Sequence, residues 1–166
     1  MNSTELREKQ APFKNKYKSD PASALLTLRA VGELGADVTC RLSFGAPPQT
    51  AGLHPAAGGD GTTSCSAEML LQALVGCAGV TLGAVATAME ITIHSGTIVA
   101  EGDVDFRGTL GLSRDVPVGF QQIRLTFDLN TDAPVDKVQK LVELAERYCV
   151  VYQTLKNSPH VISQLK

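Results

Sequence analysis

The longest apolar stretch of the chain spans residues 66–89 and reads SAEMLLQALVGCAGVTLGAVATAM. Neither a charged residue nor a proline lies between Glu68 and Glu90, so the pattern predicts a helix that is buried over most of its circumference. Its length would also allow a membrane span. Its many glycines and alanines, and flanking glutamates in place of lysine or arginine, argue against one. We therefore predict a core helix and no membrane insertion.

Apolar residues also recur at helical spacing between Pro134 and Leu155. The pattern predicts a second core helix, with Thr131 or Asp132 as its cap and Pro134 near its start. The predicted inward positions are Val135, Val138, Leu141, Val142, Ala145, Tyr148, Cys149 and Tyr152. Cys149 is therefore expected on the buried face of this helix.

Strands are predicted on both sides of the central helix. Residues 25–31 form the first, residues 32–35 a turn, and residues 38–44 a second strand that places Cys40 in the core. After the helix, residues 91–93 and 97–106 are expected to be strands separated by a break at 94–96.

The clearest strand signal covers residues 120–130, where Ile123, Leu125, Phe127 and Leu129 alternate with polar residues. This alternation predicts one buried and one solvated face. Residues 160–165 are expected to add a final edge strand. Strands and two helices in this order predict an α+β fold of antiparallel strands on two core helices.

The remaining segments are polar or rich in glycine and proline. Residues 1–20 are expected to form short helical turns interrupted by Pro12. Residues 45–66 predict a loop of about twenty residues, a length that usually indicates function or mobility. We divide the chain into a polar arm, residues 1–22, and a single domain, residues 23–166.

The composition narrows the range of possible functions. The chain has 166 residues, a formal net charge of −2 and no tryptophan, so neither a basic surface nor stacking platforms for nucleic acid are indicated. The first twenty residues contain no apolar run, which predicts a cytoplasmic protein with no secretory signal. Its four cysteines are then expected to be thiols.

The residues alone leave the role of Cys77 open. A cysteine on an apolar helix is either a packing residue with a raised pKa or a reactive thiol. Cys149 has the same two interpretations. Cys40, His54 and Cys65 lack the spacing of a metal site, and no metal is expected. His94 and His160 are expected to be solvated at strand ends.

Three segments resemble the OsmC/organic hydroperoxide resistance superfamily. They are GGDG at 58–61, AEMLLQALVGC at 67–77 and ELAERYCVVYQTL at 143–155. The sequence is most similar to the OsmC-like redox protein branch. The resemblance implies the OsmC-like fold, in which two chains intertwine into a homodimer with sites at the interface.

The resemblance also implies residue roles. Cys77 would attack a peroxide, Cys149 would close a disulfide with it, and Glu68 would help to hold an activating arginine. From the residues alone, Glu68 is equally well explained as an acidic residue that stabilises the positive end of the helix dipole. Two positions depart from the family pattern: Val150 replaces the usual proline, and the turn at 32–35 holds no arginine. Other candidates for the cation are Arg29, Arg41 and Arg147.

The expected function is therefore a thiol-dependent organic hydroperoxide reductase in oxidative stress defence. The resemblance implies no bound cofactor and an external dithiol, lipoyl-linked in better-known relatives, as the reductant. The alternative is a non-enzymatic stress-response or ligand-binding module in which Cys77 only packs.

Overall fold

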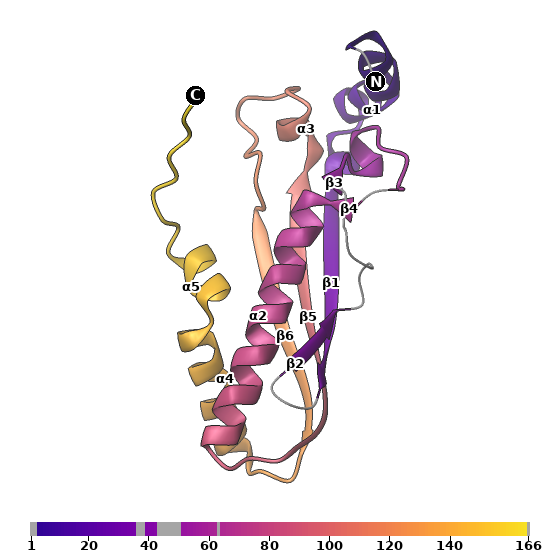
Figure 1. Cartoon of the computed structure of the whole chain (residues 1–166). Coiled ribbons are helices and arrows are strands. Elements are labelled where there is room, and N and C mark those ends of the chain that lie inside the picture. The colour runs from indigo at the N-terminus through magenta and orange to yellow at the C-terminus, as the bar shows by residue number, and fades with distance from the viewer. Residues whose placement is uncertain (1–2, 36–38, 43–50, 63, 166) are drawn as a thin grey trace.

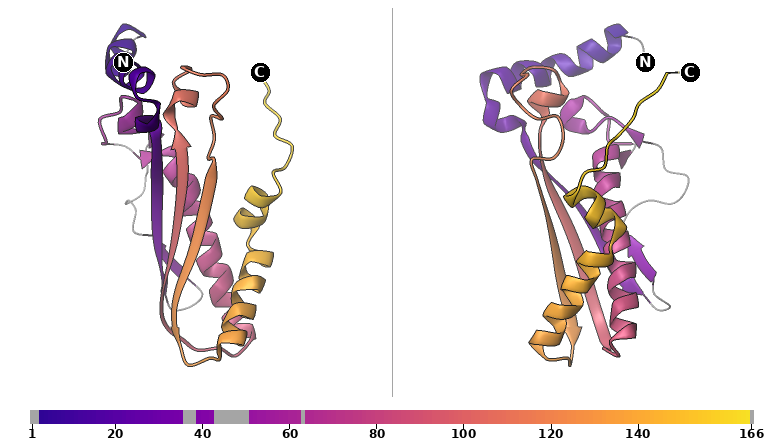
Figure 2. Two further views of the ribbon diagram at one scale, coloured as in Figure 1. Left: turned by 180° about the vertical axis from the view of Figure 1, so that it is seen from behind. Right: turned by 90° about the vertical axis from the view of Figure 1, so that its left-hand side faces the viewer.

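The structure is a computed structural model that describes residues 3–35, 39–42, 51–62 and 64–165. Its main element is a four-stranded antiparallel sheet with the order β2-β1-β5-β6. Helices α2, α4 and α5 lie on one face of this sheet (Figure 1). The view from behind shows the strands in front of the helices, and no helix of the described residues covers the other face (Figure 2). The expected α+β class is confirmed.

The strands are β1 (Leu25–Gly35), β2 (Thr39–Leu42), β5 (Ile93–Asp105) and β6 (Gln122–Thr131). Strand β6 confirms the alternation expected for residues 120–130, because its four large apolar side chains pack against the core. Its Thr126, Asp128 and Asn130 are exposed.

Helix α2 (Ser66–Ala88) confirms the predicted central helix. It packs against β1, β2 and β5 on one side and α4 and α5 on the other. Leu71, Leu74 and Leu82 are at most 1% exposed, and burying a leucine contributes about 1.5–3 kcal/mol. By length and composition, α2 is the one helix among the described residues that could cross a membrane. Here it is a core helix.

The second core helix is interrupted, which corrects the expectation of one continuous helix. Helix α4 (Val135–Tyr148) ends at Cys149, where φ −73° and ψ 110° are extended values, and α5 (Val150–Lys156) follows. The expected cap was also wrong. Pro134 is the N-cap, and the hydroxyl of Thr131 instead accepts a hydrogen bond from the amide of Ala133.

Three predictions about strand ends were wrong. Residues 32–35 continue β1 because their backbone pairs with β2, and in part with β5. Residues 94–96 do not break β5: a register shift at His94 absorbs one residue, and Ser95 and Gly96 pair with β6. Residues 160–165 form no strand, because no sheet edge lies beside this exposed tail.

The N-terminal segment is one helix, α1 (Ser3–Ser19), which continues through Pro12 and corrects the expectation of broken turns. A 3-10 turn, η1 (Pro21–Ala24), joins it to β1. Tyr17 attaches the helix to the domain: it is 2% exposed, and its hydroxyl donates to the carbonyl oxygen of Ala56 at 2.8 Å. Burial raises the pKa of Tyr17.

The expected long loop contains short elements. Two-residue strands β3 (Ala51–Gly52) and β4 (Ser64–Cys65) pair in parallel, and the 3-10 turn η2 (Pro55–Ala57) lies between them. Residues 43–50 and 63 lie outside the described part. After β5, the short helix α3 (Phe106–Thr109) turns the chain towards β6.

Gly108 provides a test of how closely α3 packs. A Cβ there would lie 2.7 Å from the carbonyl oxygen of Pro117 and 2.9 Å from that of Val116, so the backbone would have to move. Gly108→Ala should lower the free energy of unfolding by about 1–3 kcal/mol, measured by urea denaturation. Gly119→Ala, where a Cβ would meet nothing within 4 Å, should change it by less than about 0.5 kcal/mol. Equal effects would contradict the packing.

Candidate active site

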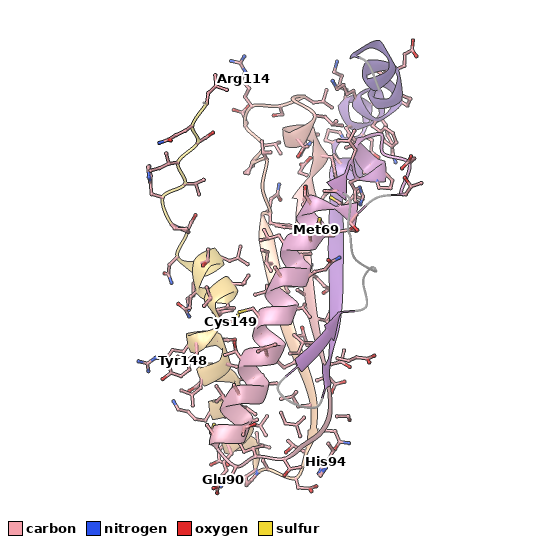
Figure 3. All side chains as sticks on the ribbon, in the orientation of Figure 1. Met69, Glu90, His94, Arg114, Tyr148 and Cys149 are labelled. Atoms are coloured by element: carbon pink, nitrogen blue, oxygen red, sulfur yellow. The ribbon has the colours of Figure 1, made fainter. Side chains whose placement is uncertain are left out.

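The fold brings the thiols of Cys77 and Cys149 together from positions 72 residues apart. Cys77 lies midway along α2 and is half-buried, whereas Cys149 lies at the α4–α5 junction and is fully buried. Their side chains are within hydrogen-bonding reach, and neither is in a disulfide. Figure 3 shows Cys149 on the side of the junction that faces α2, while Tyr148 points away.

Two opposing effects set the pKa of Cys77. Burial raises it, and this is the largest single effect. The amide of Val151, the thiol of Cys149, the amide of Val150 and the hydroxyl of Thr81 all stabilise the thiolate, and together they outweigh burial. The net result is a lowered pKa, because hydrogen bonds to the charged form favour that form.

The pKa of Cys149 moves in the opposite direction, to about 11. Burial is the main cause, and the neighbouring Cys77 raises the pKa further. The sulfur of Cys149 also caps α5 by accepting a hydrogen bond from the amide of Tyr152 at 3.4 Å. The Cys149 thiol therefore donates a hydrogen bond that favours the thiolate form of Cys77.

Sequence reasoning missed the groups that favour this thiolate. Thr81 could have been found, because it lies one helical turn after Cys77 on the same face. The amides of Val150 and Val151 carried no signal, since their orientation depends on the helix break at Cys149. They provide part of the stabilisation that was expected from an arginine.

The structure describes the side chain of one of the three arginines that were candidates for the cation beside Cys77. The guanidinium of Arg147 lies over the ring of Tyr148, 5.7 Å from its centroid, and Arg147 is not among the groups that shift the pKa of Cys77. The side chains of Arg29 and Arg41 lie outside the described part of the structure, as does that of Cys40. Their roles stay predictions.

Glu68 lies in the first turn of α2, about 13.5 Å along the helix axis from Cys77. Within the chain, the charge of Glu68 affects the pKa of His54. Burial lowers the pKa of His54, and the charge of Glu68 raises it, although by less. His54 is held by a hydrogen bond from the amide of Ala56 to Nδ1, at 3.0 Å, and stacks on Phe106.

The other sequence candidates lie elsewhere. Cys65 ends β4, far from the thiol pair along α2, and is a free thiol. His94 bonds to Asp132 at 2.8 Å, while His160 is exposed. Within the described residues, no three His, Cys, Asp or Glu side chains are grouped so that they could hold a metal ion.

Solved structures share this fold. An OsmC-like hydroperoxide resistance protein from Jannaschia sp. CCS1 aligns with a TM-score of 0.64 and 18% identity, over 86% of this chain and 94% of that one. An OsmC-like protein from Mycoplasma pneumoniae aligns with a TM-score of 0.55 and 17% identity, over 81% and 86%. The comparison with curated proteins gives no match.

A match to a family model assigns the chain to a protein family. The model described as OsmC-like protein matches residues 58–164, which include α2, the sheet strands β5 and β6, and both cysteines of the thiol pair. The match covers more than half of the chain. The protein therefore belongs to the OsmC-like family.

Proposed function

We propose that the protein is a thiol-dependent peroxide reductase that acts on organic hydroperoxides. One observation carries the proposal: the Cys77 and Cys149 thiols meet, and their pKa values move in opposite directions. A lowered pKa favours the nucleophilic thiolate, and a raised pKa keeps the partner protonated until it is needed. The Jannaschia protein is described as a hydroperoxide resistance protein, which agrees with this chemistry.

The first step uses the Cys77 thiolate. Its sulfur attacks one peroxide oxygen, an S–O bond forms, and the O–O bond breaks. The second oxygen leaves with the organic group and takes a proton as the alcohol. Cys77 is thereby oxidised by two electrons to a sulfenic acid, and the peroxide is reduced.

The second step uses Cys149. Its sulfur attacks the sulfur of the Cys77 sulfenic acid, an S–S bond forms, and the S–O bond breaks. The hydroxide leaves as water with the proton of Cys149. An external dithiol then donates two electrons and two protons, which restores both thiols and leaves the dithiol as a disulfide. Lipoyl-type dithiols are the proposed class of reductant.

We also propose that the protein acts as a homodimer. Helix α2 exposes two large apolar side chains, Leu70 and Val80, at 40% and 42%, although Gly79 between them is buried within the chain. These large apolar side chains would be covered by a second copy.

Removing Cys149 should raise the pKa of Cys77. In Cys149→Ala the thiolate loses the hydrogen bond from the thiol, so its alkylation rate, followed by peptide mass spectrometry across a pH series, should rise only at higher pH. At fixed neutral pH Cys77 should react more slowly. Thr87→Val is the matched control, because that hydroxyl on the same helix donates to the carbonyl of Gly83. Arg147→Ala should also leave the midpoint unchanged. An unchanged or lower midpoint in Cys149→Ala would refute this account.

One equivalent of cumene hydroperoxide should produce a disulfide between Cys77 and Cys149. Non-reducing peptide mapping checks the pairing. Cys149→Ser should stop at a sulfenic acid on Cys77 that dimedone traps, whereas Cys77→Ser should consume no peroxide. If the mapped disulfide joins Cys77 to Cys65, the resolving role of Cys149 is wrong. If no cysteine is oxidised, the non-enzymatic alternative replaces the enzyme.

The dimer should appear in light scattering at micromolar concentration. Val80→Glu would place a charge in the contact without filling the core, and it should shift the protein towards the monomer. Val161→Glu, in the exposed tail, is the control and should stay dimeric. A monomeric unmodified protein would exclude an interfacial site.

A further inference from the structure

A separate cavity lies at the N-terminal end of α2, away from the thiol pair. Its volume is about 380 Å³, within the range of about 300–1,000 Å³ of small-molecule sites. Its apolar wall includes Leu53, Leu70, Val104, Phe106, Val118 and Phe120. The described lining contains no Lys or Arg, and Glu68 acts on its His54. The cavity therefore suits an uncharged apolar molecule better than a carboxylate.

His54 lines this cavity, and its ring keeps one nitrogen, Nε2, outside the hydrogen bond that holds Nδ1. The amide of Ala56 donates to Nδ1, so the proton of the neutral ring lies on Nε2. Burial lowers the pKa of His54 despite the opposing charge of Glu68, and a lowered pKa favours the neutral ring. No hydrogen bond within the described part of the chain uses Nε2. Stacking on Phe106, with ring centroids 5.0 Å apart, holds the imidazole in the cavity wall.

Cys65 provides a nucleophile in the same wall. It is half-buried, and its pairing with Gly52 places it beside the segment that carries His54. Cys65 precedes Cys77 by twelve residues, about 18 Å along the helix, whereas a disulfide needs Cα atoms less than about 7 Å apart. This thiol is therefore independent of the thiol pair within the chain.

We propose that this cavity binds apolar α,β-unsaturated carbonyl compounds, that Cys65 adds to them covalently, and that His54 donates a hydrogen bond to the carbonyl oxygen. The sulfur forms a bond to the β-carbon and the carbon–carbon π bond breaks. The thiol proton ends on the α-carbon, with no change of net charge and no oxidant. The donor stabilises the negative charge that develops on the carbonyl oxygen.

The test uses trans-2-nonenal and the shorter trans-2-butenal on the whole protein, with adducts located by peptide mass spectrometry at early times. Cys65 should react before Cys77 and Cys149. Relative to glutathione, its rate should rise about tenfold or more from butenal to nonenal, because the longer chain fills the apolar cavity. Saturated nonanal should slow the reaction, and nonanoate should not. Equal labelling of the three thiols, or no dependence on chain length, would overturn the proposal.

His54→Phe tests the donor. It keeps an aromatic ring on Phe106 but removes the N–H, so the rate with nonenal should fall about tenfold while the preference for the longer chain remains. Thr109→Val is the control, because its hydroxyl lines the same cavity but donates to the carbonyl of Val118. An unchanged rate in His54→Phe would remove the donor from the proposal. If that variant does not fold, the chain-length and nonanal results on the unmodified protein still decide whether the cavity binds these compounds.

A further variant separates this proposal from the peroxidase chemistry. The double variant Cys77→Ser/Cys149→Ser lacks both thiols of the proposed reductase and should form the Cys65 adduct at the rate of the unmodified protein. Loss of the adduct in this variant would show that Cys65 does not act independently.

Discussion

The contact between helix α2 and the α4–α5 junction determines the environment of the Cys77 and Cys149 thiols. Helix α2 carries no charged residue after Glu68 and must be covered on several sides, by the sheet and by both C-terminal helices. Because α4 ends at Cys149 where the two helices meet, the amides of Val150 and Val151 turn towards α2. A straight helix would have used these amides internally, and Cys77 would have lost two of the hydrogen bonds that favour its thiolate form.

Hydrophobic periodicity predicted the parts of the fold that depend on one buried face. Helix α2 and strand β6 appear where the pattern placed them, because each has a single pattern over ten or more residues. The errors lie where pairing overrides local composition. Ser95 and Gly96 resemble a break, yet their backbone groups bond to β6, and the register shift at His94 accommodates them. The local sequence does not show which strand will pair with these residues.

For the candidate site, the sequence predicted the two cysteines but not the groups that surround Cys77. Periodicity placed Cys149 on the buried face, and the family resemblance paired it with Cys77, but a stabilising cation was expected where the described residues provide hydrogen bonds. All residues except proline have a backbone N–H, so the identities of Val150 and Val151 do not show that their amides would bond to Cys77. The helix break was equally hidden, because Val150 stands where the family usually has the proline that would have revealed it.

The sulfur of Cys149 makes two contacts: it lies against Cys77, and it accepts the hydrogen bond that begins α5. Helix α5 is only seven residues long, and a helix of that length depends on its ends. Any reaction that engages this sulfur therefore acts on the first turn of helix α5. The thiol pair and the start of the last helix thus share one sulfur atom.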